Sequence, residues 1–217
     1  MMRLNQDLIR RRDKVAKQKA LLSAATSLFA RKGYAATRTS EVAALAGCAE
    51  GLIHRYFGGK PRLLRAILTA LSLQEDIFCS KNSCPRGSLS EEIRRQVEVQ
   101  LDQLWEKRNL LLVGFSQAFI DPGVAEVLDT FRHKRENLIA RDLRHHTQGL
   151  QLKDRDIETM AKAIAALTFV YGFVRPVVLK QNRNRARNQV LEIIELMARN
   201  VQITNGHTGT KRSQSPP

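Results

Sequence analysis

Apolar residues recur three or four positions apart along most of the chain, which is the spacing of one face of a helix. In residues 13–32 this stripe includes Leu21, Leu28 and Phe29, and later segments repeat the pattern. No run of alternating apolar and polar residues, which would indicate strands, occurs between turn signals. We therefore predict an all-α protein.

Capping residues, glycines and prolines divide the apolar stripes into separate helices. Asp13 is expected to begin the first helix after a flexible basic arm, and Gly33 to end it. Two short helices follow, over about 37–45 and 50–57, and Pro61 lies in the first turn of a fourth. Further helices are predicted over about 88–105, 109–120, 122–138, 154–176 and 187–201.

The two short helices on either side of Gly47 are too short to be stable alone. Ala43 is small enough for a second helix to cross close above it, and Gly47 can adopt the positive φ of a sharp turn. Val42, Cys48 and Ile53 are then expected to be buried. This pattern predicts a helix-turn-helix, whose second helix enters the DNA major groove by its N-terminal residues. An ordinary helical hairpin is the alternative.

Positive charge is concentrated near the N-terminus. The 217 residues contain 36 Lys and Arg against 21 Asp and Glu, and residues 1–65 alone hold 14 basic and 4 acidic side chains. A local excess of this kind favours a polyanionic partner, because neutralising phosphates releases counterions. Taken by itself, the charge would equally fit an acidic lipid partner or a solvated basic face. Because it lies beside a helix-turn-helix pattern, we expect DNA as the partner.

Composition excludes several other classes of protein. An apolar fraction of 43% is too high for a disordered chain. The longest charge-free apolar stretches, residues 109–120 and 163–174, have 12 residues each, whereas crossing a bilayer takes about 20. The N-terminus has no apolar signal segment, and three cysteines cannot form a disulfide framework. We expect a soluble cytoplasmic protein without a membrane segment.

Four motifs between residues 22 and 68 agree in type and spacing with those of one known family: Phe29-Ala30-Arg31-Lys32-Gly33-Tyr34, Glu41-Val42-Ala43, Ala46-Gly47 and Arg55-Tyr56-Phe57-Gly58-Gly59-Lys60. With them, residues 15–75 resemble the DNA-binding domain of TetR-family transcriptional regulators. The resemblance implies a homodimeric, ligand-responsive repressor that binds a pseudo-palindromic operator. Its last two helices would form the dimer interface, and its C-terminal domain would hold a small-molecule effector.

The expected organisation is an N-terminal three-helix helix-turn-helix domain followed by a C-terminal helical domain. Residues 1–14 would form a basic arm and residues 15–75 the DNA-binding domain, with the helix-turn-helix at about 38–57. Residues 88–203 would form the effector-binding and dimerisation domain, and residues 204–217 a disordered tail.

The resemblance also assigns DNA contacts to the start of the second helix, to the third helix and to the head of the fourth: Arg38, Thr39, Ser40, Glu50, Gly51, Leu52, His54, Arg55, Tyr56 and Lys60. Lys60 matches a phosphate-binding lysine, and Arg55 is either a guanine reader or a phosphate anchor. The chain has Ala49, Glu50, Leu52 and His54 where the family often has Ser, Lys, Thr and Tyr. The operator sequence therefore stays open.

Aromatic residues of the C-terminal part are candidates for an effector pocket: Trp105, Phe115, Phe119, Phe131, Phe169 and Tyr171. Each of them is equally a candidate for plain core, and together they favour an apolar or aromatic effector. Two rival functions are a sequence-indifferent nucleoid-type protein and a helical-bundle enzyme, the latter using His133 with Glu136 as metal ligands. We expect neither, and predict no enzymatic activity, no cofactor and no metal.

Overall fold

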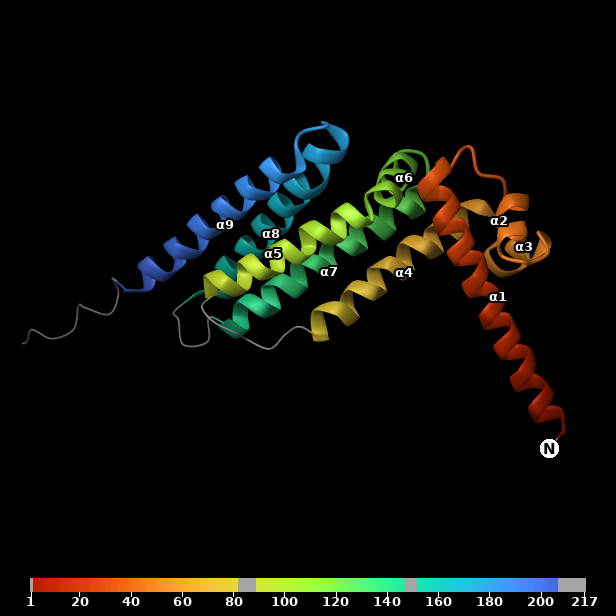
Figure 1. Cartoon of the computed structure of the whole chain (residues 1–217). Helices are drawn as coiled ribbons and strands as arrows, with labels where there is room; N and C mark the ends of the chain where they lie inside the picture. The colour runs from red at the N-terminus through yellow and green to blue at the C-terminus, as the bar shows by residue number, and fades with distance from the viewer. Residues whose placement is uncertain (1, 82–88, 147–151, 207–217) are drawn as a thin grey trace, which may run out of the picture. The chain divides into compact units, whose positions relative to one another are not determined.

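The computed structural model describes residues 2–81, 89–146 and 152–206, with side chains described for 11–71, 90–145 and 152–199. Within these ranges every regular element is helical, as predicted (Figure 1). The elements are α1 (Met2–Lys32), α2 (Thr39–Leu45), α3 (Gly51–Phe57), α4 (Lys60–Lys81), α5 (Leu89–Glu106), α6 (Arg108–Ala118), α7 (Pro122–His146), α8 (Asp154–Phe169), the π-helix η1 (Val170–Val178) and α9 (Arg183–Gly206).

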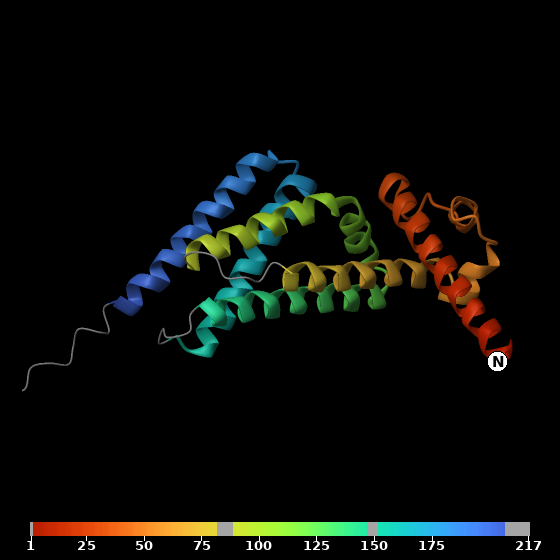
Figure 2. The same cartoon turned by 60° about the horizontal axis from the view of Figure 1, so that its bottom comes forward.

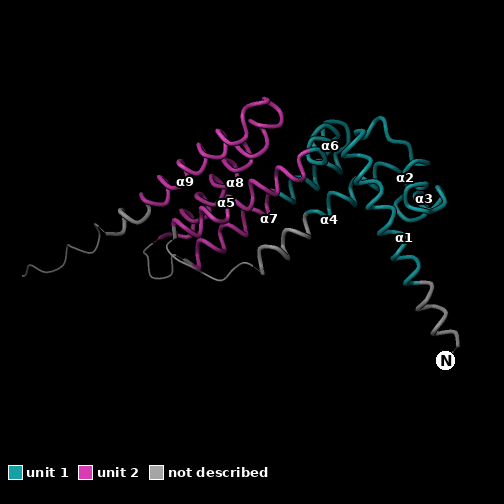
Figure 3. Tube along the Cα trace, in the orientation of Figure 1, with its two compact units in different colours: residues 1–77, 109–131 teal, residues 78–108, 132–217 magenta. Residues whose placement is uncertain are grey.

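The chain divides into two compact units (Figure 3). Unit 1 consists of residues 1–77 and 109–131, and unit 2 of residues 78–108 and 132–217. Helix α7 contributes its first part to unit 1 and its remainder to unit 2. The functional division of the chain at residues 15–75 and 88–203 stays a prediction.

Unit 1 is built around an apolar core that includes side chains of α1, α2, α3 and α4. Phe29 of α1, Ile53 of α3 and Leu63 of α4 have no exposed surface in the described chain. Val42 of α2 is 1% exposed, so the predicted burial of Val42 and Ile53 is confirmed, whereas Cys48 is only half-buried. Burying such side chains stabilises a fold by about 1.5–3 kcal/mol each, and it holds the two short helices in place.

The first helix begins earlier than predicted. It starts at Met2, so Asp13 lies inside the helix, where its carboxylate accepts a hydrogen bond of 2.8 Å from Lys17 one turn later. The prediction that Asp13 begins the helix was wrong because residues 2–12 contain no glycine or proline and many good helix formers, arginine and leucine among them. At the other end, α9 continues to Gly206, and residues 207–217 of the predicted tail lie outside the described residues.

Unit 2 is a bundle in which α5 packs against α8, η1 and α9 (Figure 2). Its core includes Val97 of α5, Leu143 of α7, Ile164 of α8 and the Val190 and Ile194 side chains of α9. These residues recur at helical spacing on the inward face of each helix, which is the pattern that predicted the helices.

The helix that was predicted to end at Pro176 does not end there. Helix α8 continues into η1, a π-helix that contains Pro176, and the backbone N–H of Leu179 donates to the Val174 carbonyl oxygen at 2.9 Å. Proline interrupts the α-helical hydrogen-bond pattern because it has no N–H, and the wider turn accommodates that loss. Gly172 lets η1 approach α5 closely, since a Cβ there would lie 2.8 Å from Leu101.

Together α8 and η1 form one continuous segment, Asp154–Val178, with a mean hydropathy of 1.4 in its most apolar window. By length and composition this segment meets the criteria for crossing a membrane, which the count of charge-free residues did not anticipate. In the structure 44% of that window is buried within the chain, and a core helix of a bundle meets the same criteria.

Candidate nucleic-acid interface

Helices α2 and α3 are joined by the sharp turn that the sequence predicts. Gly47 has a φ of +61°, which confirms the expected left-handed conformation. The backbone N–H of Cys48 donates to the Ala43 carbonyl oxygen at 2.9 Å, and that of Gly47 to Ala44 at 3.2 Å. These bonds satisfy the carbonyl groups at the end of α2, and they fix the direction in which α3 leaves the turn.

The start of α2 is fastened to the end of α1 by one carboxylate. Glu41 accepts a hydrogen bond of 2.8 Å from the Lys32 ammonium and one of 3.3 Å from the backbone N–H of Arg38. The Lys32 bond, together with the Arg38 bond, lowers the pKa of Glu41 below its ordinary value. The buried Thr37 hydroxyl donates to the Gly33 carbonyl oxygen at 2.8 Å. The loop between α1 and α2 therefore has a defined conformation.

Two of the predicted DNA contacts are hydrogen-bonded to each other. The Thr39 hydroxyl, at the first residue of α2, donates to Oε1 of Glu50 at 2.6 Å. Glu50 directly precedes α3 and is exposed. The bond links the N-terminal ends of both helices of the motif, and it restricts the Glu50 carboxylate to one region of the surface.

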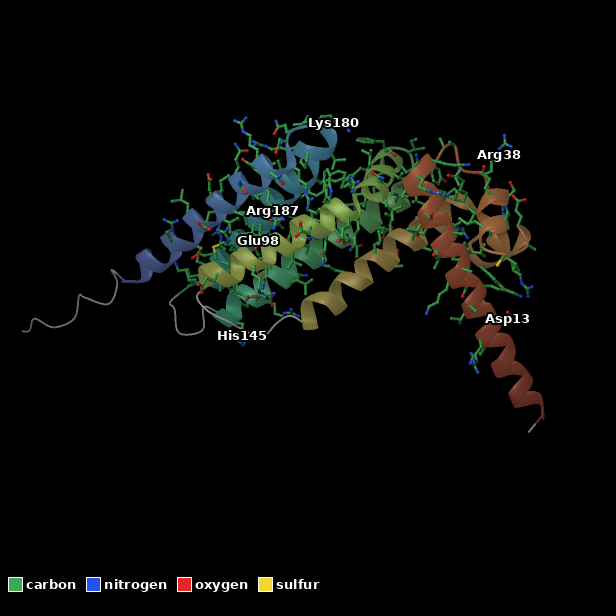
Figure 4. The ribbon with its side chains drawn as sticks, in the orientation of Figure 1. Asp13, Arg38, Glu98, His145, Lys180 and Arg187 are labelled. Atoms are coloured by element: carbon green, nitrogen blue, oxygen red, sulfur yellow. The ribbon has the colours of Figure 1, made fainter. Side chains whose placement is uncertain are left out.

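The remaining predicted contacts of α2 and α3 differ in their exposure. Arg38, Ser40, Gly51, His54 and Arg55 are exposed, and Figure 4 labels Arg38 at the α2 end of the motif. Leu52 and Tyr56, in contrast, are partly buried and pack against the core of unit 1. Their burial means that part of each side chain serves the fold, which the sequence assignment did not anticipate.

Lys60, the first residue of α4, is held by the loop that precedes α2. Its ammonium lies 4.3 Å from the centre of the Tyr34 ring and 3.5 Å from the Ala35 carbonyl oxygen. Burial lowers the pKa of Lys60 below its ordinary value. Tyr34 is itself positioned by Phe29, whose ring centre is 5.2 Å away. The ammonium is thus placed by a cation–π contact that was not foreseen from the sequence.

The sequence analysis predicted Lys60 as a contact, but it did not single out Lys14, a second lysine of this region. The Lys14 ammonium of α1 lies 5.8 Å from the centre of the Tyr56 ring of α3. A lysine 42 positions away in sequence cannot be paired with a tyrosine by helical spacing, and only the packing of α1 beside α3 reveals it. Lys14 therefore adds a positive charge beside α3.

The predicted effector aromatics fall into both units. Phe115, Phe119 and Phe131 belong to unit 1, and Trp105, Phe169 and Tyr171 to unit 2. Phe119 is 92% exposed, whereas the other five are partly buried. Phe169 stacks on Phe173 with ring centres 5.3 Å apart. Whether these residues contact an effector stays a prediction.

His133 and Glu136, which were considered as metal ligands, lie on α7. The His133 ring nitrogens are 3.0 and 3.1 Å from the Arg132 guanidinium, which places a positive charge beside them. Among the described residues, no group of three or more His, Cys, Asp or Glu side chains is arranged to hold a metal ion.

Comparisons with known proteins point to one family. The profile of bacterial regulatory proteins of the tetR family matches residues 21–67, which span the last part of α1, the helix-turn-helix and the first part of α4. A transcriptional repressor of the helix-turn-helix type from Mycobacterium tuberculosis is 30% identical over 154 residues, covering 70% of this chain and 79% of the repressor.

Two further proteins extend the comparison. The ArpR regulator of Pseudomonas putida is 30% identical over 116 residues, and the alignment covers 54% of this chain but about half, 49%, of that protein. A protein from Saccharomonospora viridis, crystallised in complex with choline, is 22% identical and has a TM-score of 0.66. That match covers 82% of this chain and 95% of the other, and it shows that the fold is shared.

We expect the substitution Glu50→Gln to raise the affinity for random duplex DNA. At the predicted DNA contact the substitution would remove one negative charge near a phosphate, and a single charge at about 4 Å in water is worth about 1 kcal/mol, or about fivefold. The amide oxygen still accepts the Thr39 bond. Fluorescence anisotropy with a labelled duplex measures the effect, and Glu126→Gln, exposed on α7, is the matched control. Unchanged affinity in Glu50→Gln would place residue 50 away from the phosphates.

Proposed function

Because the chain belongs to the TetR family of bacterial regulatory proteins, we propose that it is a sequence-specific DNA-binding transcriptional regulator. It acts as a repressor that a small-molecule effector releases from a pseudo-palindromic operator. We place it in the cytoplasm, where its DNA is, and assign it no enzymatic activity.

The observation that carries this proposal is the α2–α3 motif. Its inward residues, Val42 and Ile53, are buried, while Glu50, which directly precedes α3, and His54 and Arg55 of α3 are polar and exposed. A helix presented in this way reads base edges with the side chains of its first turns. The basic side chains of residues 1–65 supply the attraction to phosphates.

Dimerisation is supported by apolar surface on the last helices. Val170 and Val178 of η1 are 39% and 49% exposed, and Leu196 of α9 is 60% exposed. Removing apolar side chains from water is favourable, so a partner that covered them would be stabilised. A symmetric dimer formed through the Leu167–Val174 and Val190–Val201 faces would cover Val170 and Leu196, and it would place two α3 helices about 34–36 Å apart, in successive major grooves.

Effector control follows from a difference in affinity between two states. A regulator of the same fold was crystallised with choline, which supports a small-molecule site in this chain. Moving a dimer from mostly bound to mostly released takes about 5.5 kcal/mol of differential binding. The effector must therefore contact groups that change their arrangement between the two states.

The proposal is tested by selecting DNA from a random duplex pool with the purified protein at about 150 mM salt, a concentration that suppresses weak phosphate binding. We expect retained sequences to align to a two-fold symmetric site. Equal retention of all sequences would favour a nucleoid-type protein, and no retention at all would refute DNA binding.

We expect Arg55→Ala to lower affinity for the selected site more than affinity for random duplex. A bidentate arginine contact with guanine is worth about 1–3 kcal/mol, so the specific complex should weaken by about 5- to 150-fold. Anisotropy titrations of both duplexes give the ratio. Equal losses on the two duplexes would make Arg55 a phosphate anchor.

Lys60→Ala is expected to weaken binding to all sequences alike. The Lys60 ammonium is held over the Tyr34 ring at the head of α4, a position suited to a phosphate. Losing one phosphate contact should reduce the slope of log affinity against log salt by about 1. The slope is measured from titrations at several salt concentrations, and a loss confined to one base position would contradict this role.

A further inference from the structure

Unit 2 contains a small basic cleft where α5, η1 and α9 meet. It is a hollow of about 10 Å³ lined by Leu101, Tyr171, Gly172, Arg183 and Arg187. Figure 4 labels Arg187, which lies where α9 runs beside α5. A hollow of this volume holds about one water molecule, so it suits the polar end of a ligand rather than an entire ligand.

Two arginines of the cleft share one carboxylate oxygen. Arg183 and Arg187 both donate to Oδ1 of Asp102, at 2.7 and 2.8 Å. A guanidinium carries five N–H donors, and within the described chain each of these two guanidiniums uses one N–H to bind a carboxylate. Their side chains are 38% and 27% exposed. Spare donors of both arginines are therefore available to a second acceptor.

Two more arginines flank the pair, each lying on an aromatic ring. The Arg175 guanidinium is 3.9 Å from the centre of the Tyr171 ring and donates to Gln189 at 3.0 Å. The Arg108 guanidinium is 4.4 Å from the centre of the Trp105 ring. Arg183 also lies over that ring, at 4.8 Å. Stacking of this kind fixes the plane of a guanidinium, and it leaves the N–H edge free to donate.

The charge of this cluster is unbalanced. Of its four guanidiniums, only those of Arg183 and Arg187 donate to a carboxylate in the contacts just described, and both share that of Asp102. Those of Arg108 and Arg175 lie on aromatic rings and donate to neutral oxygens, of the Trp105 carbonyl and of Gln189. Like charges held this close repel one another, and an added anion would relieve that repulsion. Planar guanidiniums match carboxylate and phosphate oxygens in geometry, so the missing partner is an oxyanion.

The backbone around the cleft is irregular. Tyr171, Gly172 and Arg175 lie on the π-helix η1, a form that is frequent at functional sites. Gly172 has no room for a side chain because Leu101 and Leu104 lie within 3 Å of the position of a Cβ. Tyr171 thus lines the cleft together with Leu101 of α5 and the two arginines of α9, and Arg175 lies on the Tyr171 ring and contacts Gln189 of α9.

We propose that this cleft binds the carboxylate or phosphate group of a small molecule, with the aromatic rings of Trp105 and Tyr171 beside it. Asp102 acts as an internal competitor, since it holds one donor of each α9 arginine in the free protein. An oxyanion that takes both arginines loosens the bond between α5 and α9. The identification of this molecule as the effector rests on the proposed function, whereas the binding of an oxyanion in the cleft does not.

The experiment is isothermal titration of the full chain, at constant ionic strength, with inorganic phosphate and with benzoate as separate probes. We expect saturable binding of at least one probe, and the identity of the probe that binds distinguishes phosphate from carboxylate recognition. Arg183→Gln should weaken the affinity for that probe at least tenfold. Asp102→Asn, which keeps the shape of the side chain, should strengthen it severalfold because it removes the competing charge.

The matched control is Arg185→Gln, an exposed arginine of the same helix, which should leave binding unchanged. Circular dichroism verifies that each variant is folded. Binding of neither probe would overturn the proposal, and so would equal losses in Arg183→Gln and Arg185→Gln or a loss in Asp102→Asn. If Arg183→Gln instead abolished binding of random duplex DNA, the cleft would be a nucleic-acid contact. Oxyanion binding without selection of a DNA site would refute the proposed function alone.

Discussion

The burial of two short helices on α1 and α4 is the constraint on which the exposed surface of the helix-turn-helix depends. Helices α2 and α3 have seven residues each, too few to persist in water. Ile53 is fully buried in the core of unit 1, and Val42 nearly so. Hydrophobic packing of the buried face of α3 therefore positions its exposed side chains. The polar contacts of Glu41 and Lys60 only refine that position.

Much of the fold was predictable because local chemistry determines it. Glycine at position 47 and proline at position 61 mark boundaries that the structure reproduces, since each restricts the backbone by itself. The start of α1 was missed because Asp13 can occupy a helix interior as well as a cap. The π turn was missed because Pro176 normally ends a helix, and the close packing of η1 on α5 at Gly172 has no local signal in the sequence.

The candidate sites were predictable to different degrees. The positions of Arg38, Arg55 and Lys60 on the motif followed from matching spacing, whereas the contacts of these residues did not. Lys60 meets Tyr34 from 26 positions away, and Arg183 meets Asp102 across 81 positions. Pairings over such separations depend on how helices pack, and a single sequence contains no local signal for them.

The hydrogen bond between Thr39 and Glu50 also limits how such a protein can change during evolution. The residue before α3 and the first residue of α2 are joined, so replacing either one alters the surroundings of the other. Substitutions at the two positions should then be non-additive. If residue 50 contributes to the choice of operator, a lineage that acquires a new operator through this residue would most easily change residue 39 as well. Residues 39 and 50 would then be inherited together rather than vary independently.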